Sequence, residues 1–198
     1  FWAHGNLPAA QATAESVGLA KVRELLVMSV DASALPPAAE VPGGYEVLSL
    51  PQAEERFGRE AVEREWLRVN NDAFSWHPEQ GGWTQEDIDE RKAESWFDPA
   101  GLLLVFEKGT GRLAASHWTK IAEPTSGVGE VYVVGVDPDF QGRGLGGYAT
   151  ALGLAHLRDR GMREIELYVE GDNEPAIATY RRKGFERSAR DVMYAFEQ

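Results

Sequence analysis

Apolar and polar positions change period along the chain, and each period predicts one kind of element. Residues 45–50 alternate as in a half-buried strand, whereas residues 53–74 carry an apolar face at helical spacing. A second helix is expected from Thr84, an N-cap candidate with Asp87 three residues on, to about Trp96. The sequence SWHPEQGGWT lies between these two helices and predicts a loop.

Later segments complete an alternating order of strands and helices. Two hairpin strands joined by a Gly-containing turn are expected at residues 102–107 and 113–121, followed by an apolar strand at 130–136. An amphipathic helix is expected at 145–160, a strand at 164–169, a short helix at 174–183 and a last strand at 190–196. The strand expected at residues 130–136 is nearly all apolar, as for a strand buried on both faces. The order βααβββαβαβ implies a mixed sheet flanked by helices, so the predicted fold class is α/β, of the mixed α+β kind.

The beginning and the end of the chain resemble each other at a constant offset of 166. Five residues match at this offset: Gly5, Ala10, Ala12, Thr13 and Gly18 correspond to Gly171, Ala176, Ala178, Thr179 and Gly184. In both copies a strand end leads through a Gly turn into a short helix and a strand, which is expected at residues 22–30 in the first copy. We interpret residues 1–30 as the remnant of a preceding repeat, against the alternative of a chance match. Residues 31–44, rich in Pro, Ala and Gly, predict a linker before a complete domain at 45–198.

Composition narrows the class of partner. The chain has 198 residues, 43% of them hydrophobic, and a net charge of −12, which opposes binding to nucleic acid or to an anionic membrane. No apolar run approaches the about 20 residues needed to span a bilayer. With no cysteine there is no disulfide, thiolate zinc site or acyl-cysteine. The negative charge therefore favours a small-molecule substrate. The chain starts at Phe1 and shows no signal peptide, so a cytoplasmic location is expected.

A glycine-rich stretch, QGRGLGG at residues 141–147, lies between the apolar strand and the amphipathic helix. Its amides and the helix dipole can face a pyrophosphate, and Arg143 adds positive charge. Gly142, Gly144 and Gly147 also satisfy GxGxxG, but five residues separate the strand from the first glycine, unlike the dinucleotide fingerprint. A turn with only a structural role is the alternative.

Two ordered motifs resemble those of the GNAT acetyltransferases. GVDPDFQGRGLG is similar to the acetyl-CoA motif of that family, in which a Q/RxxGxG/A loop holds the CoA pyrophosphate. DNEPAIATYRRKGF, residues 172–185, is similar to the partner motif, an asparagine before a short helix that ends in Tyr and Gly-Phe. The resemblance implies the GNAT acyl-CoA N-acyltransferase fold, a catalytic domain at residues 45–198, acetyl-CoA as cosubstrate and no metal.

Further segments resemble the second repeat of the tandem-repeat GNAT enzymes of mycothiol biosynthesis. They are WHPEQGGWT, WFDPAG, HWTK, GEVYVVGVDP, LYVEGDN and DVMY, and together they cover essentially the whole chain. The resemblance implies direct acetylation of the cysteinyl amine of 1D-myo-inositol 2-(L-cysteinylamino)-2-deoxy-glucopyranoside in a ternary complex, and contact with a missing N-terminal repeat. A different small amine, a peptide N-terminus and a noncatalytic CoA-binding module are the alternatives.

Acetyl transfer to an alkylammonium needs a base for the amine and a proton donor for the departing thiolate. The family places a general base, acting through water, at Glu130 and the general acid at Tyr180. A solvated acid at a strand end and a packing aromatic ring are the structural alternatives for these two residues.

The remaining site residues follow from the same resemblance. Backbone amides around Val134 and Val136 are expected to bind the pantetheine, with a strand distortion that aims one amide at the thioester oxygen, against the alternative of plain strand pairing. The expected cofactor residues are Val134, Gly135, Val136, Gln141, Gly142, Arg143, Gly144, Leu145, Gly146, Gly147 and Asn173. The expected acceptor residues are Glu79, Lys120, Glu130 and Tyr168, for which solvated surface is the alternative.

His77 and His117 fit packing roles better than a metal site. The sequence leaves open whether Trp76, Trp83 and Trp96 line the acceptor pocket or fill the core.

Overall fold

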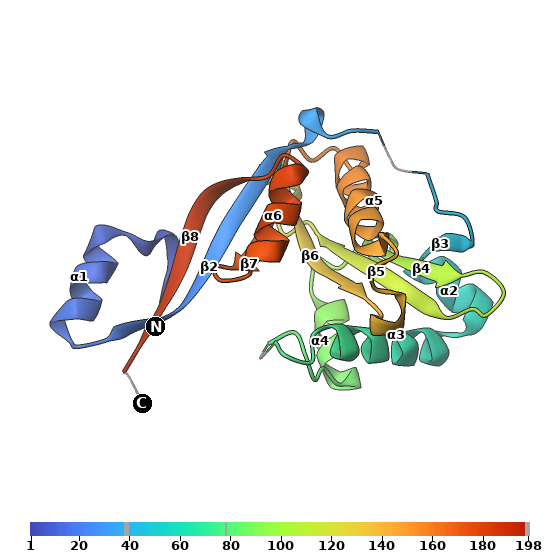
Figure 1. The fold of residues 1–198 in the computed structure, drawn as a ribbon, viewed down its shortest axis with the longest axis horizontal. Coiled ribbons are helices and arrows are strands. Elements are labelled where there is room, and N and C mark those ends of the chain that lie inside the picture. The colour runs from blue at the N-terminus through green and yellow to red at the C-terminus, as the bar shows by residue number, and fades with distance from the viewer. Residues whose placement is uncertain (38–39, 78, 197–198) are drawn as a thin grey trace. The chain divides into compact units, whose positions relative to one another are not determined.

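The computed structural model describes residues 1–37, 40–77 and 79–196, and the chain divides into two compact units (Figure 1). Unit 1 consists of Phe1–Leu35 and Glu166–Gln198, and unit 2 consists of Pro36–Ile165. Unit 2 therefore contains the glycine-rich stretch, and unit 1 contains both sequence copies that are related by the offset.

Among its described residues, unit 2 contains four complete strands in the order β6-β5-β4-β3, and each neighbouring pair is antiparallel. The strands are β3 (Tyr45–Ser49), β4 (Leu102–Glu107), β5 (Leu113–Lys120) and β6 (Val128–Val136). The predicted hairpin between β4 and β5 is confirmed, because the Glu107 amide donates to the Arg112 carbonyl over 2.9 Å. Gly109 and Gly111 in this turn have φ of 89° and 69°, a region that glycine enters without steric cost.

The helices of unit 2 are α2 (Leu50–Phe57), α3 (Arg59–Ala73), α4 (Gln85–Ala93) and α5 (Leu145–Asp159). The prediction of one helix over residues 53–74 is wrong, because Gly58 has φ of 85° and separates α2 from α3. The N-cap prediction is confirmed, since the Thr84 and Asp87 side chains form a capping box at the start of α4. No helix within the described residues is long and apolar enough to cross a membrane.

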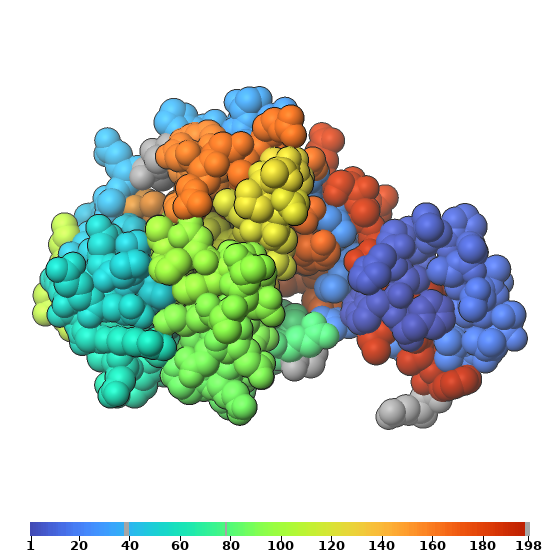
Figure 2. Space-filling model, turned by 180° about the vertical axis from the view of Figure 1, so that it is seen from behind, coloured from blue at the N-terminus to red at the C-terminus, as the bar shows by residue number. Residues whose placement is uncertain are grey.

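The two faces of the unit 2 sheet bury different helices. One face packs on α2, α3 and α4, which lie together on the surface shown in cyan and green in Figure 2. The other face packs on α5. Side chains alternate between these faces along β4: Leu104 belongs to the first cluster and Val105 to the second.

Short 3-10 turns occur in both units. One lies at Ala32–Ala34 in unit 1, and the turns Pro99–Gly101, Pro124–Ser126 and Pro138–Phe140 lie in unit 2.

Unit 1 repeats one βαβ arrangement. Its elements are β1 (Trp2–Ala3), the 3-10 turn His4–Asn6, α1 (Pro8–Ser16), β2 (Ala20–Asp31), most of β7 (Glu164–Glu170), α6 (Glu174–Arg182) and β8 (Glu186–Ala195). The strand order is β1-β8-β2-β7, with β8 antiparallel to β1 and β2. α1 and α6 have nine residues each, and their bounds are related by the same offset of 166 as the sequence copies. The last strand starts earlier than predicted, at Glu186.

Candidate active site

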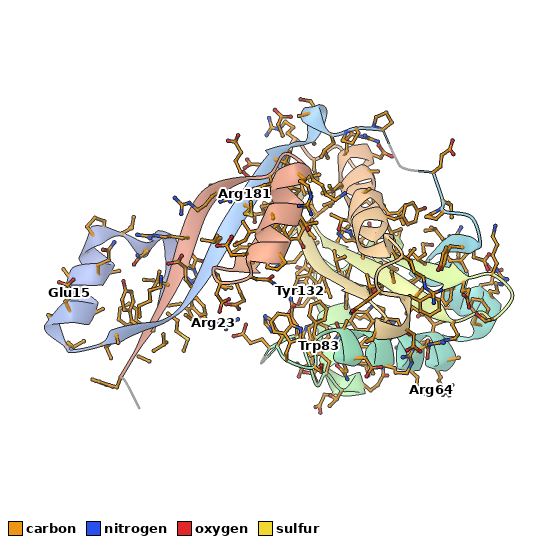
Figure 3. All side chains as sticks on the ribbon, viewed as in Figure 1. Glu15, Arg23, Arg64, Trp83, Tyr132 and Arg181 are labelled. Carbon is orange, nitrogen blue, oxygen red and sulfur yellow. The ribbon has the colours of Figure 1, made fainter. Side chains whose placement is uncertain are left out.

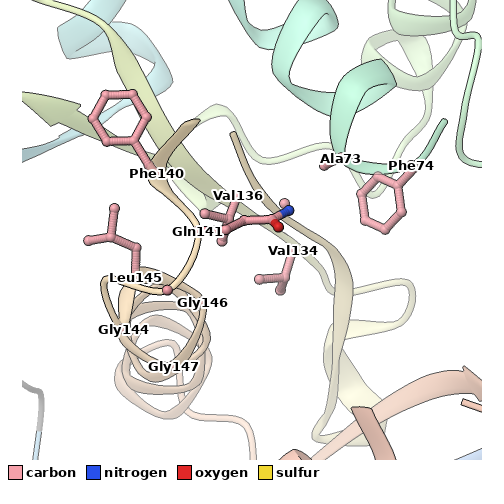
Figure 4. Close-up of a pocket in the computed structure, with 12 residues that line it drawn as sticks. Ala73, Phe74, Val134, Val136, Phe140, Gln141, Gly144, Leu145, Gly146 and Gly147 are labelled. Atoms are coloured by element: carbon pink, nitrogen blue, oxygen red, sulfur yellow. The ribbon is translucent and has the colours of Figure 1, made fainter. Parts of the chain in front are cut away.

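A cavity of about 400 Å³ opens where β6 ends and the chain enters α5 (Figure 4). This volume suits a small-molecule site. The lining residues are Ala73, Phe74, Val134, Gly135, Val136, Phe140, Gln141, Gly142, Gly144, Leu145, Gly146 and Gly147. The structure thus brings all of the predicted cofactor residues except Arg143 and Asn173 to one cavity, and it adds Ala73 and Phe74 from the end of α3 and Phe140 before the glycine-rich stretch.

The loop after β6 needs glycine at two positions. Gly142 and Gly144 have φ of 75° and 79°, in the left-handed region that L side chains rarely adopt. Gly144 is the N-cap of α5. The first amides of an α-helix have no acceptor within the helix, and the helix dipole adds partial positive charge at this end. The floor of the cavity therefore suits a phosphate group.

Arg143 lies beside the cavity and its charge is held in place by its neighbours. Its guanidinium carbon is 4.8 Å from the centroid of the Phe140 ring, and Nη2 donates to the Asp139 carbonyl over 3.1 Å. Nη1 lies 3.5 Å from the Tyr45 hydroxyl. Nη1 also lies 3.9 Å from Glu107 Oε1, and the side chain is 51% exposed.

Sequence reasoning missed Asp137, which anchors the start of this loop. The residue is 1% exposed, and its carboxylate accepts from Arg68 Nη2 over 2.7 Å and from the Asp139 amide over 2.9 Å. Arg112 Nη2 lies 3.4 Å away. Burial alone would raise the pKa of Asp137, but these hydrogen bonds and charges hold it below its usual value. The Asp-Pro pair directly after an apolar strand was the available sequence signal, since Asp caps such turns.

Glu130 and Lys120 form an ion pair across the sheet. They are register partners on β6 and β5, and Lys120 Nζ lies 3.1 Å from Glu130 Oε2. Burial raises the pKa of the Glu130 carboxyl above its ordinary value, and the Lys120 ammonium offsets part of that rise. A carboxylate whose pKa is raised toward neutrality is a better proton acceptor for an amine.

β6 carries a bulge, although not at the predicted place. Trp118 pairs with Val133 and Thr119 pairs with Val131, which leaves Tyr132 as an extra residue on β6. Ladder pairing with β5 continues through Val134, Gly135 and Val136, with Ala115 opposite Val136. The prediction that β6 is buried on both faces is wrong, because buried and partly exposed residues alternate along it. The valines that line the cavity are among the partly exposed ones.

The other predicted chemistry lies in unit 1. Tyr180 is on α6, its ring centroid is 5.8 Å from that of Phe185, and burial raises the pKa of its hydroxyl. Asn173 is the N-cap of α6, where its Oδ1 accepts from the Ala176 amide over 3.2 Å. Tyr168 on β7 is 47% exposed. Glu130, Lys120, Glu79 and the glycine-rich loop all belong to unit 2.

The loop that carries Glu79 is pinned to α3 by two asparagines. Asn70 Nδ2 donates to the Gln80 carbonyl and Asn71 Nδ2 to the Trp83 carbonyl, each over 2.8 Å. The Trp83 indole N–H donates to the Glu79 carbonyl over 2.8 Å. Trp83 therefore belongs to the core, where it is 7% exposed.

Both histidines that could suggest a metal have other partners. His77 Nδ1 accepts from the amides of Glu79 and Gln80 at 3.1 Å, which shapes the same loop. His117 on β5 is fully buried, with Nδ1 2.8 Å from the Ala149 carbonyl. Across the part of the chain that the structure describes, no group of three or more His, Cys, Asp or Glu residues could hold a metal ion.

Comparison with known proteins gives the same family from sequence and from structure. Residues 64–185 match the family model described as the Acetyltransferase (GNAT) family. The mycothiol acetyltransferase of Mycobacterium sp. (strain JLS) is 51% identical over 98% of this chain, and that of Mycolicibacterium vanbaalenii is 52% identical over 100%. The chain spans 63% and 64% of the lengths of these two relatives, less than two thirds of each.

Solved structures share the fold. A GCN5-related N-acetyltransferase from Sphaerobacter thermophilus has a TM-score of 0.71 and 28% identity, covering 98% of this chain and 57% of its own. A tandem GNAT protein from the clavulanic acid biosynthesis pathway has a TM-score of 0.65 at 19% identity, covering 95% of this chain and 58% of its own. The predicted fold class is confirmed.

Proposed function

Since the chain belongs to the GNAT family of acetyltransferases, we propose that its protein acetylates the cysteinyl amine of 1D-myo-inositol 2-(L-cysteinylamino)-2-deoxy-glucopyranoside with acetyl-CoA and so forms mycothiol. The observation that carries this proposal is 51% identity to a mycothiol acetyltransferase over 98% of the chain. The cavity at the start of α5 supports the acetyl-CoA half of the reaction, because its glycine-rich floor suits a pyrophosphate.

The residues present fit acetyl-CoA, which supplies the acetyl group as a thioester. Amides of the glycine-rich loop and the first turn of α5 would hold the pyrophosphate, with Arg143 at the rim. The backbone of Val134 and Val136 would hold the pantetheine arm at the cavity wall. The family resemblance adds Asn173, the N-cap of α6, to the proposed cofactor residues.

Two side chains would move the protons. Glu130 takes a proton from the acceptor ammonium through water, and the free amine then attacks the thioester carbon. A carbon–nitrogen bond forms, the carbon–sulfur bond breaks, and Tyr180 protonates the departing thiolate. The second proton that the nitrogen loses as it becomes an amide passes through water and restores the Tyr180 hydroxyl. A tyrosine hydroxyl is protonated at neutral pH, and burial raises the pKa of Tyr180 further above its ordinary value. The chain has no cysteine that could carry an acyl group, which supports direct passage of the acetyl group to the amine.

The acceptor assignment is tested with the full-length protein and acetyl-CoA. Cysteinyl-glucosaminyl-inositol is compared with glucosamine, simple primary amines and a peptide N-terminus, and CoA release is followed by chromatography because the acceptor itself carries a thiol. Preference for the cysteinyl compound supports the proposal, and intersecting initial-rate plots support direct transfer. Equal rates with simple amines would refute the acceptor assignment and leave only a general acetyltransferase.

The proposed proton transfers give two different pH signatures. Glu130→Gln should lower the rate most at neutral pH and recover part of it as the acceptor amine deprotonates in solution. Tyr180→Phe should lower turnover while acetyl-CoA binding stays nearly intact, since its proton matters when the thiolate leaves. Full activity in either variant removes that residue from the mechanism, and equal losses at every pH in both would indicate a folding defect.

We also propose that residues 1–30 are the end of a preceding repeat, that residues 31–44 are a linker, and that the protein's N-terminal repeat contacts this chain. The matching bounds of α1 and α6 support the duplication. Gly18 and Gly184, which follow these helices, have φ of 72° and 90°, so each helix also ends in the same backbone conformation.

A further inference from the structure

The Lys120 ammonium lies in a corner formed by two aromatic rings. Lys120 Nζ is 5.4 Å from the centroid of Trp96 and 5.2 Å from that of Tyr132. The two rings meet edge to face, with centroids 5.0 Å apart and an interplanar angle of 64°. The Glu130 carboxylate closes the third side at 3.1 Å. Two aromatic faces and a carboxylate are the chemical groups that attract an alkylammonium ion.

This corner is assembled from three segments that the unit 2 fold brings together. Glu130 and Tyr132 are two residues apart on β6 and share a face, and Lys120 lies opposite Glu130 on β5. Trp96 follows α4. The buried ring of Trp118 contacts both aromatic rings from behind, with centroids 6.0 Å from Trp96 and 5.6 Å from Tyr132. The walls of the corner are therefore fixed by the core.

Arg91 on α4 holds the second wall in place. Its Nε donates to the Tyr132 hydroxyl over 3.2 Å, and its guanidinium stacks on Trp83 at 3.8 Å from the ring centroid. Figure 3 labels Tyr132, which lies on β6, and Trp83, which lies just before the start of α4. Because Trp83 is itself buried, the Tyr132 ring is anchored at its outer end as well as at its base. The corner is preorganised before any ligand arrives.

Lys120 is the movable member of the group. Its side chain is 24% exposed, and a lysine stem has four rotatable carbons between the backbone and the charge. By contrast, the rings are held by Trp118 and Arg91. An acceptor whose amine must reach Glu130 arrives as a second cation at the same carboxylate, and two like charges there repel each other.

We propose that Trp96, Tyr132 and Glu130 form a binding box for the acceptor's primary ammonium group, which Lys120 occupies until the acceptor displaces it. The proposal rests on the proposed function for the identity of the acceptor but not for the chemistry of the box. The box selects a primary ammonium group and places it beside the carboxylate that accepts its proton through water. The displaced Lys120 then stands beside the acceptor, where its charge faces the sugar hydroxyls.

The test uses full-length protein and the smallest suitable probe, methylammonium chloride, with sodium chloride added to keep ionic strength constant. Lys120→Met removes the competing charge and keeps the stem, and Lys120→Gln is the second variant in case the first fails to fold. Lys108→Met is the matched control, because Lys108 lies in the exposed β4–β5 turn and its loss changes net charge equally. Binding is followed by the indole N–H resonance of Trp96, assigned with Trp96→Phe.

Lys120→Met should bind methylammonium about tenfold more tightly than the wild type and the Lys108→Met control, since the competitor is gone. Adding Tyr132→Leu to Lys120→Met should abolish this gain, and methanol, a neutral molecule of similar size, should not bind. No gain in Lys120→Met and Lys120→Gln, or equal binding of methanol, would overturn the proposal. The probe needs neither acetyl-CoA nor the sugar acceptor. Methylammonium binding without acetylation of the cysteinyl compound would therefore refute only the proposed function.

Discussion

Acid should destabilise this protein through the buried ring of His117 on β5. The ring is fully buried, its Nδ1 lies 2.8 Å from the Ala149 carbonyl of α5, and its Nε2 has no hydrogen-bond partner among the described residues. Gly153 of α5 lies so close that an added Cβ would be 2.1 Å from the ring. Water therefore cannot solvate an imidazolium at this position, and burial lowers the pKa of His117 from 6.5 to about 4.

The sign and the size of the effect follow from this difference in pKa. In the unfolded chain the ring gains a proton as the pH falls through 6.5, whereas in the folded protein it stays neutral until about pH 4. The unfolded state thus binds more protons in this window, and the free energy of unfolding falls as the pH is lowered. The contribution of the neutral His117 ring to the free energy of unfolding is fully present above pH 6.5. About 3 kcal/mol of it is lost by pH 4.

The assay is urea unfolding at a series of pH values between 7 and 4, for the wild type and for His117→Gln. The variant removes the titrating group but keeps a polar side chain of similar length. The free energy of unfolding of the variant will be lower than that of the wild type at pH 7. Between pH 7 and pH 4, however, it should fall by about 3 kcal/mol less than that of the wild type. His156 is retained in both proteins, so its own titration largely cancels in the difference. Parallel pH profiles for the two proteins would refute the reasoning.

Three further predictions concern the loop and the helix that follows it. Arg143→Ala should weaken acetyl-CoA binding by about 1 to 3 kcal/mol in calorimetry at low salt, less at high salt, and an unchanged Kd would show that its charge is unused. Gly153→Ala should lower the free energy of unfolding by about 1 to 3 kcal/mol in urea, because the new methyl group meets the His117 ring, and wild-type stability would contradict the packing. Asp137→Ala should cost about 3 kcal/mol, since it removes the buried carboxylate that Arg68 and Arg112 share, and a loss below about 1 kcal/mol would show that the anchor is unimportant.

Elements with a strong local signal could be predicted from the sequence. The capping box at Thr84, the β4–β5 turn and the helix after the glycine-rich loop each depend on neighbouring residues, and each is present. The break between α2 and α3 could not be predicted in this way. A glycine inside a helical pattern costs only about 1 kcal/mol, so whether Gly58 continues the helix or ends it is decided by packing.

The supports of the site were beyond sequence reasoning because they join distant segments. Asp137 is held by Arg68, which lies 69 residues earlier, and no local pattern links the two. The three undecided tryptophans differ only in their surroundings. Trp83 is in the core, Trp76 is 63% exposed, and Trp96 lies against Lys120. Glu130 and Lys120 were each named from the family resemblance, whereas their ion pair and the aromatic corner around it needed the structure.

The bulge on β6 explains how one strand can serve both halves of the proposed reaction. Strict alternation would place Glu130, Tyr132 and Val134 on one face of the sheet. With Tyr132 as an extra residue, Tyr132 and Val133 both pack on the side of Trp118, and Val134 packs on the side of α5. Glu130 therefore faces the aromatic corner, whereas Val134 and Val136, four and six residues later, face the cavity at the start of α5. Without the extra residue Val134 would lie on the same face as Glu130, so the bulge places the proposed base and the proposed cofactor wall on opposite faces of one strand.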